Sequence, residues 1–212
     1  MSSSLYLNSL IIIALLLTAC NNSSKQQNRI DQPCVAASVG SYPEQATSAY
    51  VLPWNIGEEY LVGQGNCTTG SHNAKNNAQF GYDFAMPIGT TIVAARAGVV
   101  FQLEASFVDG NGANGGSNYL IIEHSDGSFA IYGHLTSMGV LVDLAEEVEQ
   151  GQAIALSGST GTSDPHLHFE VSNVTDTDNI VSVSARVTLP LTFKNTREHP
   201  DGLVENQHYR AL

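Results

Sequence analysis

Short runs of β-branched and aromatic residues, separated by glycine-rich turns, dominate the middle of this 212-residue chain. Such runs favour β-strands, because branched side chains pack well on a pleated surface and glycine permits the turns between strands. No segment has a convincing long helical pattern, and Asp126-Gly127 between two of the runs indicates a hairpin. We therefore predict a mainly β, single-domain antiparallel sheet with long loops and little helix. The expected strands are Tyr82–Ala85, Thr91–Ala94, Gly98–Ala105, Asn118–His124, Ser128–Gly133, Ala153–Ser157 and Leu167–Val171.

The N-terminus has the pattern of an export signal. The apolar run Leu10–Leu17 is too short to span a bilayer and is typical of the core of a secretory signal, although no Lys or Arg precedes it. The run ends at Cys20 in a Leu-Thr-Ala-Cys sequence, which resembles the lipobox of bacterial lipoproteins. This resemblance implies a signal peptide over residues 1–19, a lipid anchor on Cys20 and a polar, flexible tether over residues 20–33. An ordinary signal peptide that happens to contain a cysteine is the alternative.

The charge of the chain limits which partners it can bind, and its cysteine content indicates the compartment. Eight basic residues against twenty acidic ones leave no basic stripe to meet phosphates, so we expect no nucleic-acid partner. Cys34 and Cys67 remain after the lipobox cysteine, and an even remainder in an oxidising compartment predicts one disulfide, with two free buried thiols as the alternative. A mature chain of about 190 residues suits one domain with its own core, and we expect a monomer.

Four histidines and one aspartate carry the chemistry expected of this chain. His166 and His168 alternate with apolar residues on one expected strand, so both project from the same face. His134 ends another strand, His72 lies in a Gly/Asn-rich loop, and Asp83 stands between aromatic residues, where a carboxylate is costly unless it is paired or bound to a metal. Taken singly, each is more often structural: a strand-end histidine is usually hydrogen-bonded, and an aspartate can cap a turn. Together they supply the nitrogen and oxygen ligands that a catalytic zinc needs.

Several motifs occur in a specific order along the chain: Tyr82-Asp83-Phe84-Ala85-Met86-Pro87, Tyr132-Gly133-His134-Leu135, Gly158-Ser159-Thr160-Gly161 and Pro165-His166-Leu167-His168-Phe169. On these motifs the chain resembles peptidase family M23, the LytM/lysostaphin-type zinc endopeptidases of bacterial cell walls. The resemblance implies a β-sandwich-like LytM fold of the duplicated hybrid motif type. It places the peptidase-like domain at residues 60–172, between an N-terminal extension at 34–59 and a C-terminal extension at 173–212.

The resemblance also implies a zinc ion with three protein ligands and two catalytic imidazoles: His72, Asp83 and His168 as ligands, and His134 and His166 as the imidazoles. One position departs from the family pattern. The usual first ligand is a histidine four residues before the aspartate, and this chain has Gln79 there, whose amide oxygen is a poor zinc ligand. We expect His72 to replace it from a longer loop, as in a branch of the family with a long His-to-Asp spacer. The alternative is a degenerate site without metal.

A zinc-dependent endopeptidase that hydrolyses the peptide cross-links of peptidoglycan is the function that the resemblance implies. No His-Glu-x-x-His motif supplies a glutamate base, so one of the catalytic imidazoles must move the proton. Asn21 after the lipobox cysteine favours, by resemblance to lipoproteins, the periplasmic face of the outer membrane. An inactive module that binds the cell wall or activates a separate amidase remains the alternative, and a structural wall-binding lipoprotein is a third. We also expect one more strand within Val181–Leu191 and a partly ordered tail over Thr196–Leu212.

Overall fold

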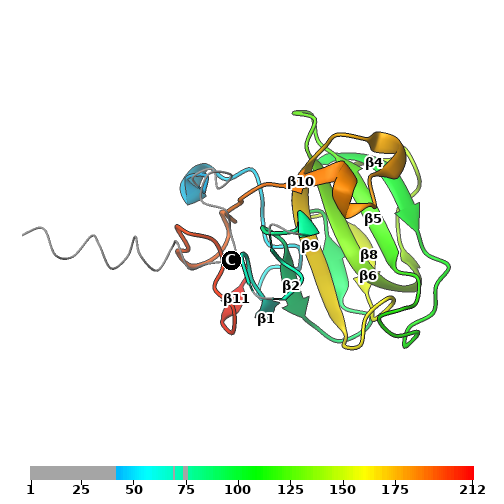
Figure 1. Ribbon diagram of the computed structural model, residues 1–212. Coiled ribbons are helices and arrows are strands. Elements are labelled where there is room, and N and C mark those ends of the chain that lie inside the picture. The colour runs from blue at the N-terminus through cyan, green and yellow to red at the C-terminus, as the bar shows by residue number, and fades with distance from the viewer. Residues whose placement is uncertain (1–41, 69, 74–75) are drawn as a thin grey trace, which may run out of the picture. The chain divides into compact units, whose positions relative to one another are not determined.

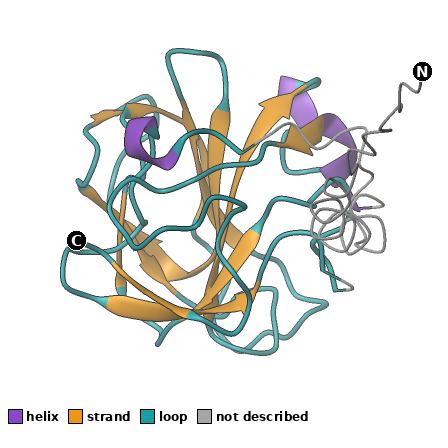
Figure 2. Ribbon diagram, turned by 90° about the vertical axis from the view of Figure 1, so that its left-hand side faces the viewer, coloured by secondary structure: helices purple, strands orange, loops and turns teal. Residues whose placement is uncertain are grey.

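Residues 42–68, 70–73 and 76–212 are described by the computed structural model, and all of them belong to one compact unit. Antiparallel strands and loops make up most of this part, and its helical residues are confined to short 3₁₀ turns (Figure 2). The mainly β, antiparallel fold expected from the sequence is therefore confirmed. The elements are η1 (Gln45–Thr47), β1 (Glu59–Gln64), β2 (Tyr82–Ala85), β3 (Thr91–Val93), β4 (Gly98–Glu104), β5 (Asn118–Glu123), β6 (Phe129–Val140), β7 (Glu147–Val148), β8 (Ala153–Ser157), β9 (His166–Val174), η3 (Thr177–Asn179), η4 (Val183–Ala185), β10 (Arg186–Thr188) and β11 (His208–Arg210).

The two longest strands, β6 and β9, lie side by side near the middle of the sheet (Figure 1). The strand order is β11-β1-β2-β9-β6-β5-β4-β7, with β10 added to β9, and β8 joining β3 to β6. The first half of β6 pairs with β5 and β9, whereas its second half pairs with β8. Ile92 of β3 and Ile154 of β8 belong to the same buried core as Tyr82 and Tyr132, so apolar side chains are enclosed between two parts of the sheet, as in a sandwich.

Strand alternation separates the core from the opposite face of the sheet. Leu167, Phe169 and Val171 of β9 are buried in the main hydrophobic core, together with Tyr82 and Phe84 of β2. Because successive side chains point to opposite faces, the residues between them on these two strands project to the other side. Those intervening residues are His166, His168 and Glu170 on β9 and Asp83 on β2. The same pattern that builds the core therefore gathers polar groups on one face.

All seven expected strands are present and the Asp-Gly hairpin is confirmed. Gly127 has φ +79° and its amide donates to the carbonyl of His124, closing the turn between β5 and β6. However, β6 continues to Val140, beyond the expected end at Gly133, because the ladder passes through a bulge at His134, which therefore lies within the strand and not at its end. The additional strand expected within Val181–Leu191 is β10. The short strands β1, β7 and β11, which contain two to six residues, were not expected from the sequence.

The expectation of a partly ordered C-terminal tail is wrong. Strand β11 pairs with β1, and Leu203, Tyr209 and Ala211 are buried in the main core. The signal segment, Cys20, the tether and Cys34 lie outside the described residues. No helix in the described part of the chain has the length and apolar character needed to cross a membrane.

Candidate metal centre

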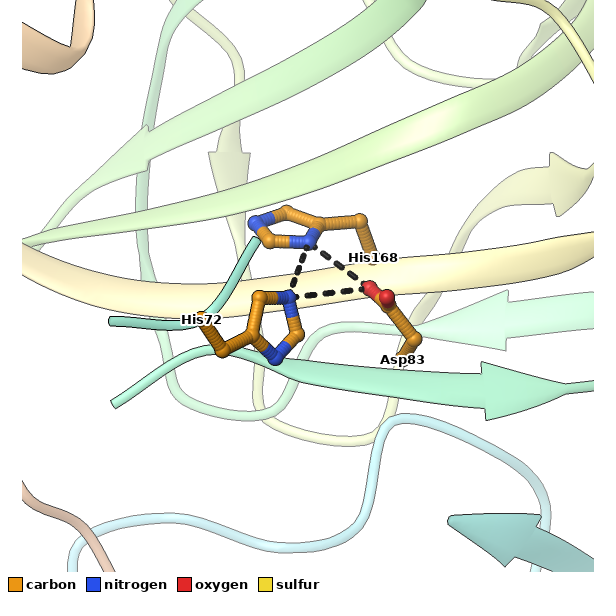
Figure 3. Close-up of side chains that lie close together, drawn as sticks. All are labelled: His72, Asp83 and His168. Carbon is orange, nitrogen blue, oxygen red and sulfur yellow. Dashed lines mark hydrogen bonds and ion pairs between the residues drawn. The ribbon is translucent and has the colours of Figure 1, made fainter. Parts of the chain in front are cut away.

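Three side chains from distant parts of the chain converge on the polar face of the sheet (Figure 3). The Nε2 atom of His72 lies 3.3 Å from Asp83 Oδ1 and 3.3 Å from His168 Nδ1. The third distance, from His168 Nδ1 to Asp83 Oδ1, is 2.8 Å. The side chain of His72 is almost fully buried, whereas those of Asp83 and His168 are each 16% exposed. The cluster is thus formed by one buried imidazole and two groups that solvent can reach.

Strand pairing and one loop bring these groups together. Asp83 of β2 and His168 of β9 are paired residues in the ladder that joins the two strands, so their side chains lie on the same face. His72 comes from the loop between β1 and β2, and the amide of Thr68 donates to its carbonyl. Its Nδ1–H group donates to the carbonyl oxygen of Gly65 at 3.1 Å, which leaves Nε2 directed at the other two ligands.

The cluster fits a zinc ion in donor type and spacing. Zinc in proteins prefers imidazole nitrogen, thiolate and carboxylate oxygen, and in a tetrahedral site with bonds near 2.0–2.1 Å any two ligand atoms are about 3.3 Å apart. Both distances from His72 Nε2 equal this spacing, whereas the 2.8 Å between His168 Nδ1 and Asp83 Oδ1 is shorter, as for a hydrogen bond that a metal ion would replace. The glycines beside the cluster leave room for it, since a Cβ atom at Gly81 would lie 3.3 Å from His72 Nε2 and 3.1 Å from a ring carbon of His168. Three ligands leave a fourth tetrahedral position for water or substrate.

Two more imidazoles lie next to the three ligands. The ring of His134 is 4.6 Å from that of His166 and 6.1 Å from that of His168, measured between ring centroids. His134 Nδ1–H donates to the carbonyl of Thr160 at 2.7 Å, and His166 Nδ1–H donates to that of Asp164 at 2.8 Å. These bonds commit both Nδ1 atoms to the backbone and leave both Nε2 atoms available for chemistry.

The electrostatics differ between His134 and His168. Burial, together with the neighbouring imidazoles of His168 and His166, lowers the pKa of His134 to about 4. His134 is therefore neutral at pH 7. Burial also opposes the charged form of His168, but the hydrogen bonds and negative charges of Asp83 and Glu170 outweigh it and raise the pKa to about 10. In the metal-free protein His168 carries a proton that zinc would displace.

A β-bulge orients His134. Asn118 of β5 pairs with Leu135 of β6, and the next residue, Tyr119, pairs with Gly133, so His134 is the extra residue in the ladder. Its φ of +61° is unusual for a residue other than glycine. Bulges are frequent next to active sites because they redirect a side chain. Here the bulge directs an imidazole toward the cluster.

A cavity of about 610 Å³ opens beside the cluster and includes His72, His134 and His168 in its lining. Tyr119, Ile131 and Val181 contribute apolar surface to the same cavity. The cavity therefore offers apolar walls next to the metal position.

The structure brings together all five residues proposed from the sequence for the site. Gln79, at the usual position of the first ligand, is buried, and its backbone carbonyl accepts a hydrogen bond from the amide of Cys67. Cys67 is disulfide-bonded, and the other two cysteines lie outside the described residues, so the pairing with Cys34 stays a prediction.

Two residues of the site, Glu170 and Arg186, were not expected from the sequence. Glu170 has no exposed surface, and its Oε2 atom lies 3.2 Å from His168 Nε2. Its position two residues after His168 on the same strand face is the signal that points to this contact. Arg186 has no such signal, because only the pairing of β10 with β9 brings it to the site.

About half of the chain matches the model of a known protein family. Residues 77–180 match the family model of peptidase family M23. The chain is 32% identical over 142 residues to the murein hydrolase activator NlpD of Salmonella dublin, which covers 67% of this chain and 34% of that protein. It is 39% identical over 92 residues to the peptidoglycan DD-endopeptidase ShyA of Vibrio cholerae, which covers 43% of this chain and 19% of that protein.

Among solved structures, the antimicrobial peptidase lysostaphin of Staphylococcus simulans aligns with 28% identity and a TM-score of 0.47, covering 68% of this chain and 52% of that chain. The chain spans about a third or less of the length of the curated relatives compared above.

Proposed function

We propose that this chain, whose residues 77–180 match the model of peptidase family M23, is a zinc-dependent endopeptidase that hydrolyses peptide cross-links of bacterial peptidoglycan. The observation that carries the proposal is the convergence of one ligand atom each from His72, Asp83 and His168 within 4.8 Å of one another. Similarity to a peptidoglycan DD-endopeptidase supports the substrate class. The two imidazoles beside the cluster support a catalytic role over a purely structural metal site.

Bound zinc would polarise the scissile carbonyl and lower the pKa of a coordinated water. The protein's own part is to move protons, and His134 and His166 are placed for it. Each presents a free Nε2 atom, because its Nδ1–H group is bound to a backbone carbonyl. Neutral His134 can accept a proton from the attacking water at Nε2 and pass it to the leaving amine. His166, whose Nε2 is 3.7 Å from Asp83 Oδ1, can stabilise negative charge on the substrate oxygen when it carries a second proton on Nε2, and the two imidazoles can also exchange these duties.

The location that we propose follows from the N-terminal pattern and from cell-wall relatives. A signal peptide over residues 1–19, a lipid on Cys20 and the tether over residues 20–33 would hold a monomeric domain at the periplasmic face of the outer membrane, facing the wall. The peptidase-like domain is proposed at residues 60–172, with extensions at 34–59 and 173–212. The disulfide-bonded state of Cys67 supports an oxidising compartment.

Activation of a separate amidase is the second candidate function. The similarity to a murein hydrolase activator over 142 residues favours it, and so does Gln79 at the usual position of a ligand. The complete set of two nitrogens and one carboxylate oxygen argues for the endopeptidase, because an activator without activity has no chemical need for the metal ligands and for the two free imidazoles.

Metal content tests the ligand assignment. We expect about one zinc per chain in the purified protein by elemental analysis, since the three ligand atoms converge on one point. His72→Ala should lose the metal, because two ligands cannot hold it, whereas Gln79→Ala should keep it. Loss of zinc from Gln79→Ala with retention in His72→Ala would contradict the assignment.

Release of soluble fragments from purified peptidoglycan tests the activity. The zinc-loaded protein should release cross-link cleavage products from sacculi, and chelation of the metal should abolish the release. A zinc-loaded protein that releases nothing alone, but stimulates an added amidase, would instead establish the activator function.

A further inference from the structure

We propose that Glu170 and Arg186 form a positioning pair that holds the ring of His168 with Nδ1 directed at the metal position. The inference rests on the proposed function. The carboxylate of Glu170 bridges the two partners: Oε2 lies 3.2 Å from His168 Nε2, and Oε1 accepts a hydrogen bond from Arg186 Nε. Neither residue touches the three ligand atoms directly, so both act through His168.

His168 depends on this contact more than the other imidazoles depend on theirs. His72, His134 and His166 each donate Nδ1–H to a nearby backbone carbonyl and present Nε2 to the site. His168 is reversed, because it presents Nδ1 and directs Nε2 into the protein. A metal ligand needs a free lone pair on Nδ1, so the ring proton must reside on Nε2, where an acceptor is required. Glu170 is that acceptor.

Arg186 reduces the free-energy cost of burying the Glu170 carboxylate. A carboxylate without exposed surface is costly to keep charged unless it is paired and hydrogen-bonded. The Oε1 atom of Glu170 accepts hydrogen bonds from the Arg186 guanidinium and the Ser172 hydroxyl, while Oε2 faces His168 Nε2. These contacts pair the buried carboxylate and hold both of its oxygens in place.

Arg186 lies outside the family-like segment, which is the stretch of residues 77–180 that matches the family model. Arg186 is the first residue of β10 and lies six residues after the family match ends at residue 180. It pairs with Val174 of β9. Its Nη1 atom donates to the carbonyls of Ile180 and Val181, which ties the connection between β9 and β10 to the same side chain. The C-terminal extension thus contributes to the metal centre through one arginine.

Zinc affinity of full-length variants tests the proposal. Glu170→Leu combined with Arg186→Met removes the acceptor without leaving an unpaired buried charge. We expect its zinc dissociation constant, measured by competition with a chromophoric chelator, to rise 10–100-fold. Glu170→Gln combined with Arg186→Met keeps an amide oxygen for the Nε2–H group and should recover part of the affinity. Removing the Arg96–Asp126 pair by Arg96→Met and Asp126→Asn is the matched control, and its affinity should not change.

The outcomes separate this proposal from the function on which it rests. Wild-type protein that binds zinc, together with a folded Glu170→Leu/Arg186→Met variant of equal affinity, would overturn the positioning pair and leave the metal site intact. Wild-type protein that binds no zinc would overturn both. If the apolar variant does not fold, the Glu170→Gln/Arg186→Met variant decides, since an affinity equal to that of wild type would reject the proposal and a loss of about tenfold would support it.

Discussion

His134 combines a left-handed backbone conformation with a chemically available imidazole. A residue with a Cβ atom at φ +61° is strained by about 1 kcal/mol relative to glycine. The fold retains this strain at the one bulge residue whose side chain faces the proposed metal position. Strained residues of this kind are characteristic of functional sites, where geometry outweighs local stability.

Replacing His134 by glycine and by alanine separates its backbone strain from its chemistry. Both variants should keep zinc, since His134 is not one of the three ligands, and both should lose about 100-fold or more of the hydrolytic rate through the missing proton transfer. His134→Gly should be more stable than His134→Ala by about 1 kcal/mol, because glycine accepts the positive φ. Zinc content, sacculus digestion and chemical denaturation measure the three quantities. Loss of zinc from both variants would assign His134 to the ligands.

His124 makes the stability of the fold depend on pH, independently of the metal site. It is buried, it donates from Nδ1 to the carbonyl of Ala97, and its Nε2 has no hydrogen-bond partner among the described residues. Burial lowers its pKa, and the charge of Arg96 adds to the effect, while the hydrogen bond and Asp126 oppose it. As the pH falls below about 6.5, the folded state therefore binds fewer protons at His124 than the unfolded state does. Acidification consequently lowers the free energy of unfolding.

The variant His124→Asn tests this, because asparagine keeps a donor for Ala97 and does not titrate. From pH 7 to pH 5 the free energy of unfolding of the metal-free variant should fall less steeply than that of wild type, by at most about 1.4 kcal/mol per pH unit. Urea denaturation at several pH values measures the slopes. Equal slopes would show that His124 titrates alike in both states.

At the scale of elements, the turn between β8 and β9 packs directly onto the backbone of β6. A Cβ atom at Gly158 would lie 2.3 Å from the amide nitrogen of Thr136 and 2.5 Å from the carbonyl carbon of Leu135. Backbone atoms in a ladder cannot move aside as a flexible side chain can. The close approach places the start of β9, and so His166, beside the bulge that carries His134.

Gly158→Ala should consequently destabilise the domain by more than about 2 kcal/mol, in the upper part of the range for overpacked sites. Gly63→Ala in β1 is the matched control, because a Cβ there meets its nearest atom at an ordinary 3.6 Å. The melting temperatures of both variants, measured by thermal unfolding, give the comparison. An undisturbed melting temperature in Gly158→Ala would mean that the turn can shift away from β6.

At the scale of the whole molecule, the segment that follows the family match at residues 77–180 completes the core. Tyr209 of β11 is buried, its hydroxyl accepts a hydrogen bond from the amide of Val204, and the guanidinium of Arg197 lies 4.4 Å from its ring centroid. Phe193 is also fully buried and lies within 6.0 Å of Phe169 between ring centroids. Residues outside the family-like segment therefore support the strands that carry the ligands.

Tyr209→Ala should cost about 3–5 kcal/mol of unfolding free energy, as expected for a large buried aromatic side chain. Leu212→Ala, three residues later and 67% exposed, should change it by less than about 0.5 kcal/mol. Denaturant titration provides both values. Equal stability of the two variants would mean that the C-terminal segment packs only weakly on the domain.

The sequence by itself determined the strands and the faces of their side chains. Alternation with a period of two is a local property, so Leu167 and Phe169 could be assigned to the core, and His166 and His168 to the opposite face, without knowledge of any partner strand. The Asp-Gly turn was predictable for the same reason, since its conformation depends on two adjacent residues.

The sequence indicated which site groups meet only through its resemblance to a family, and the tertiary structure decided how they are brought together. His72 and His168 are separated by 96 residues, and their contact depends on the path of the loop after β1 and on the ladder that pairs Asp83 with His168. Arg186 reaches Glu170 only because β10 adds to β9. Register and loop path arise from the packing of the whole core, and no local pattern encodes such long-range contacts.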